Sequence, residues 1–250
     1  MKILVTGSNG QLGSEIKGLQ SNYENIKCIF KDLPELDISD ADSVNSFIIN
    51  EHINVVINCA AYTAVDKAEE NIELAEKVNS LGVSNLVKAL ERVNGRLIHI
   101  STDYVFDGKS SQPYKELDKV SPIGTYGLTK RAGELAVINS KIDAVVIRTS
   151  WLYSSFGDNF VKTMLSLGKK KESLNVISDQ IGTPTYARDL AKVCLEILSS
   201  PNKENINKNG KIYHYSNEGF ASWYDFAVLI MEIAELNCKV KPIQTKDYPT

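Results

Sequence analysis

The sequence contains no long apolar run and no clustered cysteines or histidines, and these absences exclude several kinds of protein. No apolar stretch approaches the ~20 residues that a membrane-spanning helix needs, so we expect no membrane partner. The chain begins directly with a strand pattern, without the apolar core of a signal peptide. The four cysteines show no Cys-x-x-Cys spacing and the three histidines lie far apart, so neither forms a metal-ligand pattern. We therefore expect a cytoplasmic protein with reduced thiols in its core.

The sequence also lacks an excess of charge of either sign. It has 28 lysines and arginines against 31 aspartates and glutamates, a net charge of -3, so there is no basic surface for nucleic acid. An anionic ligand would have to be held by local groups. The 250 residues, 43% hydrophobic and 24% charged, have the composition of a soluble globular protein. This length allows one large domain or a domain with a small lobe.

Three glycines follow the first predicted strand, which covers residues 2–6. Gly7, Gly10 and Gly13 have the spacing G-x-x-G-x-x-G, and a helical pattern begins at Ser14. Strand, glycine-rich turn and helix is the order in which a Rossmann unit binds a pyrophosphate at a helix N-terminus. The spacing differs from the standard G-x-G-x-x-G, and the alternative is a tight turn whose glycines only supply positive φ. We favour the dinucleotide loop because three glycines in seven residues directly follow an N-terminal strand.

A second predicted strand, residues 26–30, ends next to two charged residues. Asp32 lies 25 residues after Gly7, near the position at which such folds hydrogen-bond the adenosine ribose. Lys31 beside it could instead contact a 2′-phosphate. Both NAD and NADP therefore stay open as the cofactor.

Strand and helix patterns alternate as far as residue 150. Further strands are predicted at 54–59, 96–100 and 144–149, and a long amphipathic helix at 72–93 contains Asn79. This alternation of βα units indicates an α/β fold with a parallel, doubly wound (Rossmann) sheet. The small residues that follow the strand at 54–59 either let a cofactor approach the backbone or simply pack tightly. A mid-helix asparagine such as Asn79 is usually solvated, with a structural role as the alternative.

Hydroxyl groups gather where open α/β sheets place their ligands. Ser101 and Thr102 directly follow the strand at 96–100, and Tyr126 follows 24 residues after Thr102. A helix that starts there places Lys130 one turn from Tyr126 on the same face. A phenol keeps its proton up to pH ~10. We therefore expect the ammonium to lower the pKa of Tyr126 and suit it to proton transfer near pH 7.

This pair is weak evidence by itself. With 11 tyrosines and 23 lysines, about one Tyr-x-x-x-Lys is expected by chance. A second one, Tyr23 to Lys27, lies between a helix and a strand, and we interpret it as surface sequence. The functional interpretation of Tyr126 therefore depends on the rest of the chain.

Beyond residue 150 the regular alternation ends. Helices are predicted at 156–167, 187–198 and 222–235, and a short strand at 211–215. We expect residues 1–150 to form an NADP-binding Rossmann domain, with 184–200 packing back onto it. Residues 151–183 and 201–250 would form a smaller C-terminal substrate-binding lobe.

Together these residues resemble the extended short-chain dehydrogenase/reductase family, and within it the dTDP-4-dehydrorhamnose reductases. Two motifs are specific to that branch: Ser-Thr-Asp-Tyr-Val-Phe-Asp-Gly at 101–108 and Arg-Thr-Ser-Trp at 148–151. The resemblance runs through most of the chain, with further matches at Thr6–Gly13, Asn58–Glu69, Tyr126–Lys130 and Asp179–Thr185.

The resemblance implies roles for individual residues. Tyr126 would be the proton donor, Lys130 would bind the nicotinamide ribose, and Thr102 would hydrogen-bond the reacting oxygen. Trp151 would pack on the substrate, and Asp37 and Ile38 would flank the adenine. The cofactor site as a whole would comprise Gly7, Gly10, Gln11, Leu12, Gly13, Asp32, Asp37, Ile38, Ala60, Ala61, Tyr62, Thr63, Asn79, Tyr126 and Lys130. The substrate site would comprise Thr102, Asp103, Tyr104 and Trp151.

The implied reaction is the reduction of the C4 ketone of dTDP-4-dehydro-L-rhamnose to dTDP-L-rhamnose, a polysaccharide precursor. NADP(H) is the expected cofactor, with NAD(H) as the alternative. Related 4,6-dehydratases carry Thr-Asp-Glu, whose carboxylate abstracts a proton beside the ketone. The third residue here is Tyr104, so that base is absent and simple reduction fits better.

Two departures from the family pattern qualify these expectations. The chain stops at Thr250, where relatives continue with a loop and a helix that help to close the substrate pocket, so we expect a truncation. Some relatives form homodimers through a metal held by acids near Glu15. Glu15 is present, but residues 186–189 do not clearly supply the other ligands. We expect no metal and leave a homodimer open.

Two alternative functions stay open. The chain could be a non-catalytic NADP-binding subunit, like the regulatory subunits of methionine adenosyltransferase that resemble the same reductases. The presence of Thr102, Tyr126 and Lys130 argues against this. It could also reduce another nucleotide-linked 4-keto sugar, because pocket shape rather than a motif selects the sugar.

Overall fold

A computed structural model describes residues 1–199 and 211–248 of the chain. At its centre lies a six-stranded sheet in the order β10-β5-β4-β3-β1-β2, in which every neighbouring pair is parallel. This confirms the predicted doubly wound α/β fold. The strands are β1 (Lys2–Thr6), β2 (Lys27–Lys31), β3 (Val55–Asn58), β4 (Arg96–Thr102), β5 (Asp143–Thr149) and β10 (Lys211–His214).

The chain reverses its direction across the sheet at β1. It runs outward from β1 to β2, returns past β1 to β3, and continues through β4 and β5 to β10. Ligands of open α/β sheets bind beyond the carboxyl ends of the strands at such a switch point. The loops after β1 and β3 meet there, and the loop after β4 lies beside them.

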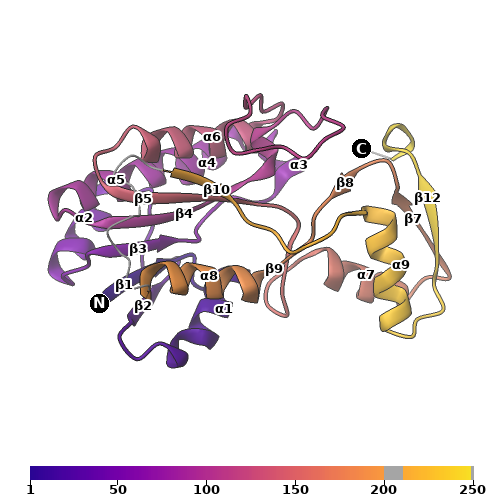
Figure 1. Ribbon diagram of the computed structural model, residues 1–250, viewed down its shortest axis with the longest axis horizontal. Coiled ribbons are helices and arrows are strands. Elements are labelled where there is room, and N and C mark those ends of the chain that lie inside the picture. Colours follow the sequence, from indigo (N-terminus) through magenta and orange to yellow (C-terminus); the bar gives the residue numbers. More distant parts are fainter. Residues whose placement is uncertain (200–210, 249–250) are drawn as a thin grey trace.

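Helices cover both faces of the sheet (Figure 1). α1 (Gln11–Leu19) and α8 (Ala187–Ser199) pack on one face, and α2 (Ala41–Asn50), α5 (Val83–Arg92) and α6 (Thr125–Ile138) on the other. Alternate strand residues point to opposite faces. β1 therefore gives Leu4 to one core cluster and Ile3 and Val5 to the other.

The helix predicted at 72–93 is one continuous helical segment with a π-helical turn inside it. α4 (Ile72–Glu76) runs into the π segment η2 (Lys77–Gly82) and then into α5. Single π turns occur frequently at functional sites, and this one carries Asn79. The shorter helices are α3 (Val65–Ala68), η1 (Gln20–Asn22), η3 (Asp103–Val105) and η5 (Thr245–Asp247).

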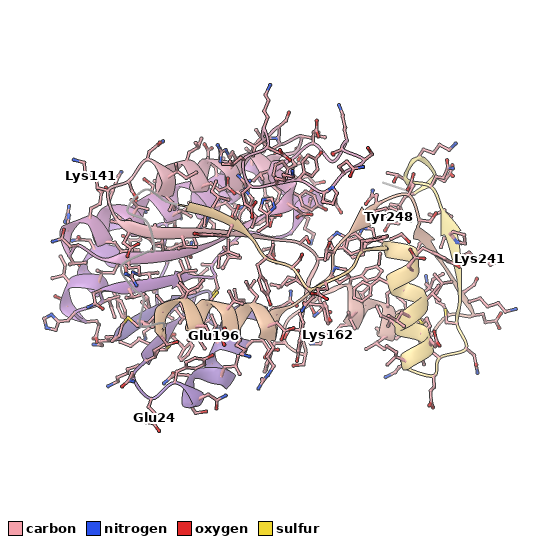
Figure 2. The ribbon with its side chains drawn as sticks, in the orientation of Figure 1. Glu24, Lys141, Lys162, Glu196, Lys241 and Tyr248 are labelled. Atoms are coloured by element: carbon pink, nitrogen blue, oxygen red, sulfur yellow. The ribbon has the colours of Figure 1, made fainter. Side chains whose placement is uncertain are left out.

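A smaller lobe with its own apolar core lies beside the sheet. It contains α7 (Phe160–Gly168), α9 (Trp223–Ile233) and a parallel pair of strands, β7 (Ser173–Ile177) and β12 (Lys239–Ile243). Lys162, Lys241 and Tyr248 mark this lobe, whereas Glu196 lies on α8 of the large body (Figure 2). Short strand pairs lie between the two parts: β6 (Leu152–Tyr153) with β9 (Thr185–Tyr186), and β8 (Ile181–Gly182) with β11 (Ala221–Ser222).

The structure corrects two details of the sequence prediction. β10, which we placed in the lobe, pairs with β5 and extends the main sheet. α7 starts at Phe160 and not at residue 156, because the Asn159 side chain accepts a hydrogen bond from the Lys162 N–H and so caps the helix there. The assignment of the lobe to substrate binding stays a prediction, and residues 201–210 of the predicted lobe lie outside the described part. Within residues 1–199 and 211–248, no helix combines the length and apolarity that crossing a bilayer requires.

Candidate active site

The glycine loop after β1 has the backbone geometry of an anion site. Gly7 has φ +59°, and a Cβ there would lie 2.6 Å from the backbone of Ala60. A Cβ on Gly13 would overlap the backbone of Ser8. Gly10 precedes α1, and no side chain caps that helix end, so N–H groups of its first turn stay free for a ligand. The loop therefore fits a pyrophosphate.

The first two residues of α1 contribute in different ways. The Gln11 side chain turns toward the lobe, where its Oε1 accepts from Asn159 Nδ2 (3.0 Å). Leu12 is buried in the core beneath α1, so only its backbone could meet a cofactor.

Asp32, which is predicted to bind the adenosine ribose, lies against this loop. Its Oδ2 accepts from the Asn9 N–H (2.8 Å) and its Oδ1 from the Leu33 N–H (2.8 Å). The Lys31 ammonium lies 3.3 Å from Glu35 Oε1. A carboxylate and a lysine thus lie side by side, and the choice between NAD and NADP stays open.

The two residues predicted to flank the adenine differ in exposure. Asp37 accepts hydrogen bonds from the backbone and the hydroxyl of Ser39, and these bonds hold the pKa of Asp37 below its usual value. The Ile38 side chain is buried beneath Gly82, where an added Cβ would lie 2.7 Å from it. Ile38 could therefore offer only its backbone to a ligand.

Asn79 has a structural role, and the expectation that it is solvated is wrong. It is fully buried, and its side chain accepts from the Tyr62 N–H (2.9 Å) and donates to the Tyr62 carbonyl (3.1 Å) and to Thr129 Oγ1 (3.2 Å). Asn79 thereby fixes the loop after β3 to α6. Of the four predicted cofactor residues in that loop, Ala60, Ala61 and Tyr62 are half-buried and Thr63 is exposed. A direct contact of any of them with a cofactor stays a prediction.

Thr102 and Tyr126 meet at the carboxyl end of β4. The Thr102 hydroxyl donates to Asp103 Oδ1 (3.0 Å) and accepts from the Tyr104 N–H (3.2 Å), and it lies near enough to the Tyr126 phenol to act on the pKa of that group. The Tyr104 and Tyr126 rings lie edge to face with centroids 5.4 Å apart. The predicted proton donor, its hydroxyl partner and two predicted substrate residues therefore form one cluster.

The prediction that Lys130 lowers the pKa of Tyr126 is wrong for this structure. Burial raises the pKa of the Tyr126 phenol above its ordinary value, and the nearby Thr102 hydroxyl opposes this only in part. Lys130 lies one turn away as predicted, but its Nζ donates to the carbonyl of Ile100 (2.6 Å). Burial lowers the pKa of Lys130 to about 8. Both groups are therefore protonated at neutral pH.

Asp103 is the other strongly perturbed group of the cluster. Burial raises the pKa of its carboxyl to about 6, against the opposing hydrogen bond from Thr102. Perturbed pKa values of this kind gather at functional sites.

The sequence prediction missed Glu69, which fixes the start of the helix that carries Tyr126. Its two carboxylate oxygens accept from the N–H (2.7 Å) and the hydroxyl (2.9 Å) of Thr125, the first residue of α6. An added Cβ on Gly124 would lie 2.8 Å from the same carboxylate. A residue 56 positions away in sequence gives no local signal, although Glu69 ends one of the family-like motifs.

Trp151 lies between the two parts of the molecule. It has φ +47°, and its indole stacks on Trp223 of α9 with ring centroids 3.4 Å apart. Gly182 lies so close to the indole that an added Cβ would overlap it. Trp151 thus joins the end of β5 to the lobe, and its packing on a sugar stays a prediction.

Glu15, the acid considered as a metal ligand, has other partners in the structure. Glu15 is buried, accepts from Ser154 Oγ (2.7 Å) and faces Arg188 Nη1 (3.4 Å). No group of three potential ligands from His, Cys, Asp and Glu gathers anywhere in 1–199 or 211–248. The absence of a metal stays a prediction.

A doubly wound sheet with a glycine loop and a Thr/Tyr/Lys cluster beyond β4 defines the class of this chain: a short-chain dehydrogenase/reductase. The model of the family described as "RmlD substrate binding domain" matches residues 1–250. A dTDP-4-dehydrorhamnose reductase of Aggregatibacter actinomycetemcomitans is 42% identical over an alignment of 255 positions, which covers 100% of this chain and 86% of that protein. The chain belongs to the dTDP-4-dehydrorhamnose reductase family.

Solved structures agree with this assignment. A dTDP-4-dehydrorhamnose reductase of Clostridium acetobutylicum superimposes with a TM-score of 0.92 at 46% identity, covering 100% of this chain and 86% of that one. The enzyme of Bacillus anthracis in complex with NADP gives a TM-score of 0.90 at 38% identity, covering 99% and 86%. The resemblance inferred from the motifs is therefore confirmed.

Proposed function

We propose that this protein reduces the 4-keto group of a dTDP-linked sugar with a nicotinamide cofactor, and that the sugar is dTDP-4-dehydro-L-rhamnose. The observation that carries the proposal is the cluster of Thr102, Tyr104 and Tyr126 beside a glycine loop that fits a pyrophosphate. The reductase names of the relatives support the substrate.

The cofactor site would be built by Gly10, the first turn of α1 and Asp32. The NADP complex of the Bacillus anthracis relative supports NADPH as the reductant, and NADH is the alternative. When bound, the reduced nicotinamide supplies the hydride. Lys130, whose ammonium donates to the Ile100 carbonyl of β4, would hold the nicotinamide ribose.

Tyr126 would protonate the oxygen that becomes an alkoxide. Because burial raises the pKa of the phenol, the proton stays on Tyr126 until a more basic oxygen forms beside it. The Thr102 hydroxyl would donate a hydrogen bond to the same oxygen. Such preorganised donors stabilise developing charge more than water does.

The test is NADPH and NADH oxidation with dTDP-4-dehydro-L-rhamnose by the wild type, Tyr126→Phe and Tyr23→Phe. Tyr23 begins the second Tyr-x-x-x-Lys of the chain and is the matched control. We expect turnover in the wild type and in Tyr23→Phe, and a loss of about 100-fold or more in Tyr126→Phe.

Two results would contradict the proposal in different ways. Equal turnover in Tyr126→Phe would remove Tyr126 as the proton donor. Cofactor binding by the wild type without turnover of this sugar would reject the substrate, and turnover of another nucleotide-linked 4-keto sugar would then identify the replacement.

A further inference from the structure

A fully buried carboxylate lies on α6 one turn beyond Lys130. Glu134 Oε1 accepts from Ser101 Oγ (2.7 Å) and Arg148 Nε (2.7 Å), and Oε2 accepts from Arg148 Nη2 (2.9 Å) and Arg131 Nη1 (2.7 Å). Arg148 on β5 is buried as well. A buried ion pair is weak evidence for stability, because apolar replacements of equal volume are often as stable. The position of Glu134 therefore points to a role beyond folding.

Three successive residues at the end of β4 contact one face of α6. Ile100 accepts from Lys130, Ser101 donates to Glu134, and Thr102 lies near enough to Tyr126 to act on the pKa of its phenol. The three helix residues are spaced by four and share that face. On β4 Ser101 lies between the other two residues, whereas on α6 Glu134 lies one turn beyond Lys130, and Arg148 ties Glu134 to β5.

We propose that Glu134 is a positioning residue, which fixes the face of α6 that carries Tyr126 and Lys130 against the end of β4 that carries Thr102. This inference rests on the proposed function, which supplies the reaction whose groups are positioned. The positioning itself is argued only from the contacts of Glu134.

The charge of Glu134 acts on Lys130 as well. Burial lowers the pKa of the Lys130 ammonium, and Glu134 is the strongest of the charges that oppose this. The other groups that face Lys130 are Cys59 after β3 and His99 on β4, and burial holds both neutral at pH 7. Burial would raise the pKa of Glu134 itself, but the hydrogen bonds from Arg148 and Ser101 hold it below its usual value, so the carboxylate stays ionised.

A matched control lies at the opposite end of the same two strands. Arg96 at the start of β4 donates through Nε to Asp143 Oδ2 (2.7 Å) at the start of β5. Six residues of strand, about 20 Å, separate this ion pair from Thr102. Asp143→Asn removes an arginine–carboxylate pair between β4 and β5 without touching the face of α6.

The experiment compares Glu134→Gln, Ser101→Ala and Asp143→Asn with the wild type. In protein with isotope-labelled lysine, NMR follows the titration of Lys130, whose signal is assigned by its loss in Lys130→Met. Glu134→Gln should lower the Lys130 pKa by about one unit or more, while Ser101→Ala and Asp143→Asn leave it within about 0.2 units.

Turnover gives the second measurement. Glu134→Gln should lower kcat about 10- to 100-fold at pH 7 with KM within about threefold, and its kcat should decline with rising pH at a lower pH than that of the wild type. Ser101→Ala, which keeps the charge, should lower kcat about three- to tenfold. Asp143→Asn should keep the wild-type kcat.

An unchanged Lys130 titration in Glu134→Gln, or an equal loss of kcat in Asp143→Asn, would overturn the proposal. If Glu134→Gln does not fold, Ser101→Ala tests the positioning role of Glu134 instead. A wild-type kcat in Ser101→Ala contradicts that role. A wild type without turnover of any nucleotide sugar would reject the proposed function, and the Lys130 titration would still test Glu134.

Discussion

The two faces of the central sheet are built from the same strands but differ toward their carboxyl ends. On the face beneath α1 and α8, the inward residues stay apolar: Ile3, Val5, Ile57, Ile98, Val145 and Ile147. On the face beneath α2, α5 and α6, an apolar layer of Leu4, Val56, Leu97 and Val146 is followed by polar residues. That polar layer comprises Thr6, Asn58, His99, Ser101 and Arg148.

The polar layer is hydrogen-bonded across the sheet. Thr6, Asn58 and His99 are partners in the strand register, with Thr6 Oγ1 2.6 Å from Asn58 Oδ1 and Asn58 Nδ2 3.1 Å from His99 Nδ1. Burial of a polar group is costly unless it is hydrogen-bonded. Because side chains alternate along a strand, one strand can supply an apolar core on one face and a site on the other. Stability and activity should therefore respond to different residues.

The largest expected effect is a loss of stability on the apolar face. Leu195 on α8 is fully buried, and Leu195→Ala should lower the free energy of unfolding by about 3 kcal/mol through lost burial and a residual cavity. Urea denaturation measures this, with Glu196→Ala on the exposed side of the same helix as the control. We expect kcat of the folded variant to stay within about twofold of the wild type. If kcat falls together with the free energy of unfolding, then stability and activity do not depend on different faces of the sheet.

The next-largest effect is expected on the polar face, where a substitution should lower activity and raise stability. Lys130→Met should lower kcat about 100-fold and yet stabilise the fold, because burial disfavours the ammonium that it removes. The pKa of Lys130 is about 8 in the folded state, against an ordinary value of 10.5 for a lysine in water. Below pH 8 both the folded and the unfolded state carry the charge, and the burial penalty is complete.

Between those two values the folded protein loses the proton first, so the wild type gains stability as the pH rises. The advantage of Lys130→Met should therefore shrink from pH 7 to pH 10, as measured by urea denaturation at both values. A variant that is less stable than the wild type at pH 7 would show that the bond to Ile100 outweighs the burial of the charge.

The sequence predicted those parts of the site that depend on short-range pattern. The spacing of Gly7, Gly10 and Gly13 after an apolar strand predicted the anion loop, and the family-like motifs brought Thr102 and Tyr126 together. The effect of Lys130 on the pKa of Tyr126 was predicted incorrectly, because spacing along a helix gives the face but not the hydrogen-bond partner. That partner is a carbonyl of β4, which only the packed sheet supplies.

Long-range contacts explain the remaining misses. β7 and β12 carry no pattern that distinguishes them from loop sequence, and they form by pairing across 66 residues at Ser173 and Lys239. β10 was predicted as a strand, but its place beside β5 depends on the edge that β5 leaves open. Glu134 had a local signal, an acid four residues after Lys130, but its partners on β4 and β5 had none.

The smallest expected effect lies at the edge of the polar face, where Glu69 holds the first turn of α6. Its carboxylate accepts two bonds from Thr125, and a negative charge at a helix N-terminus is worth about 0.5 kcal/mol when exposed. Glu69→Gln keeps an acceptor but removes the charge, so kcat should fall only about two- to fivefold as Tyr126 loses part of its fixed position.

Salt identifies the cause of that effect. At 1 M NaCl the Debye length is about 3 Å, so a charge interaction at the surface is screened and the ratio of wild-type to Glu69→Gln kcat should approach one. The exposed neighbour Glu70 provides the control, since Glu70→Gln changes net charge equally and should leave kcat unchanged at both salt concentrations. An effect of Glu69→Gln that persists at high salt would assign the role of Glu69 to hydrogen-bond geometry, because geometry is not screened.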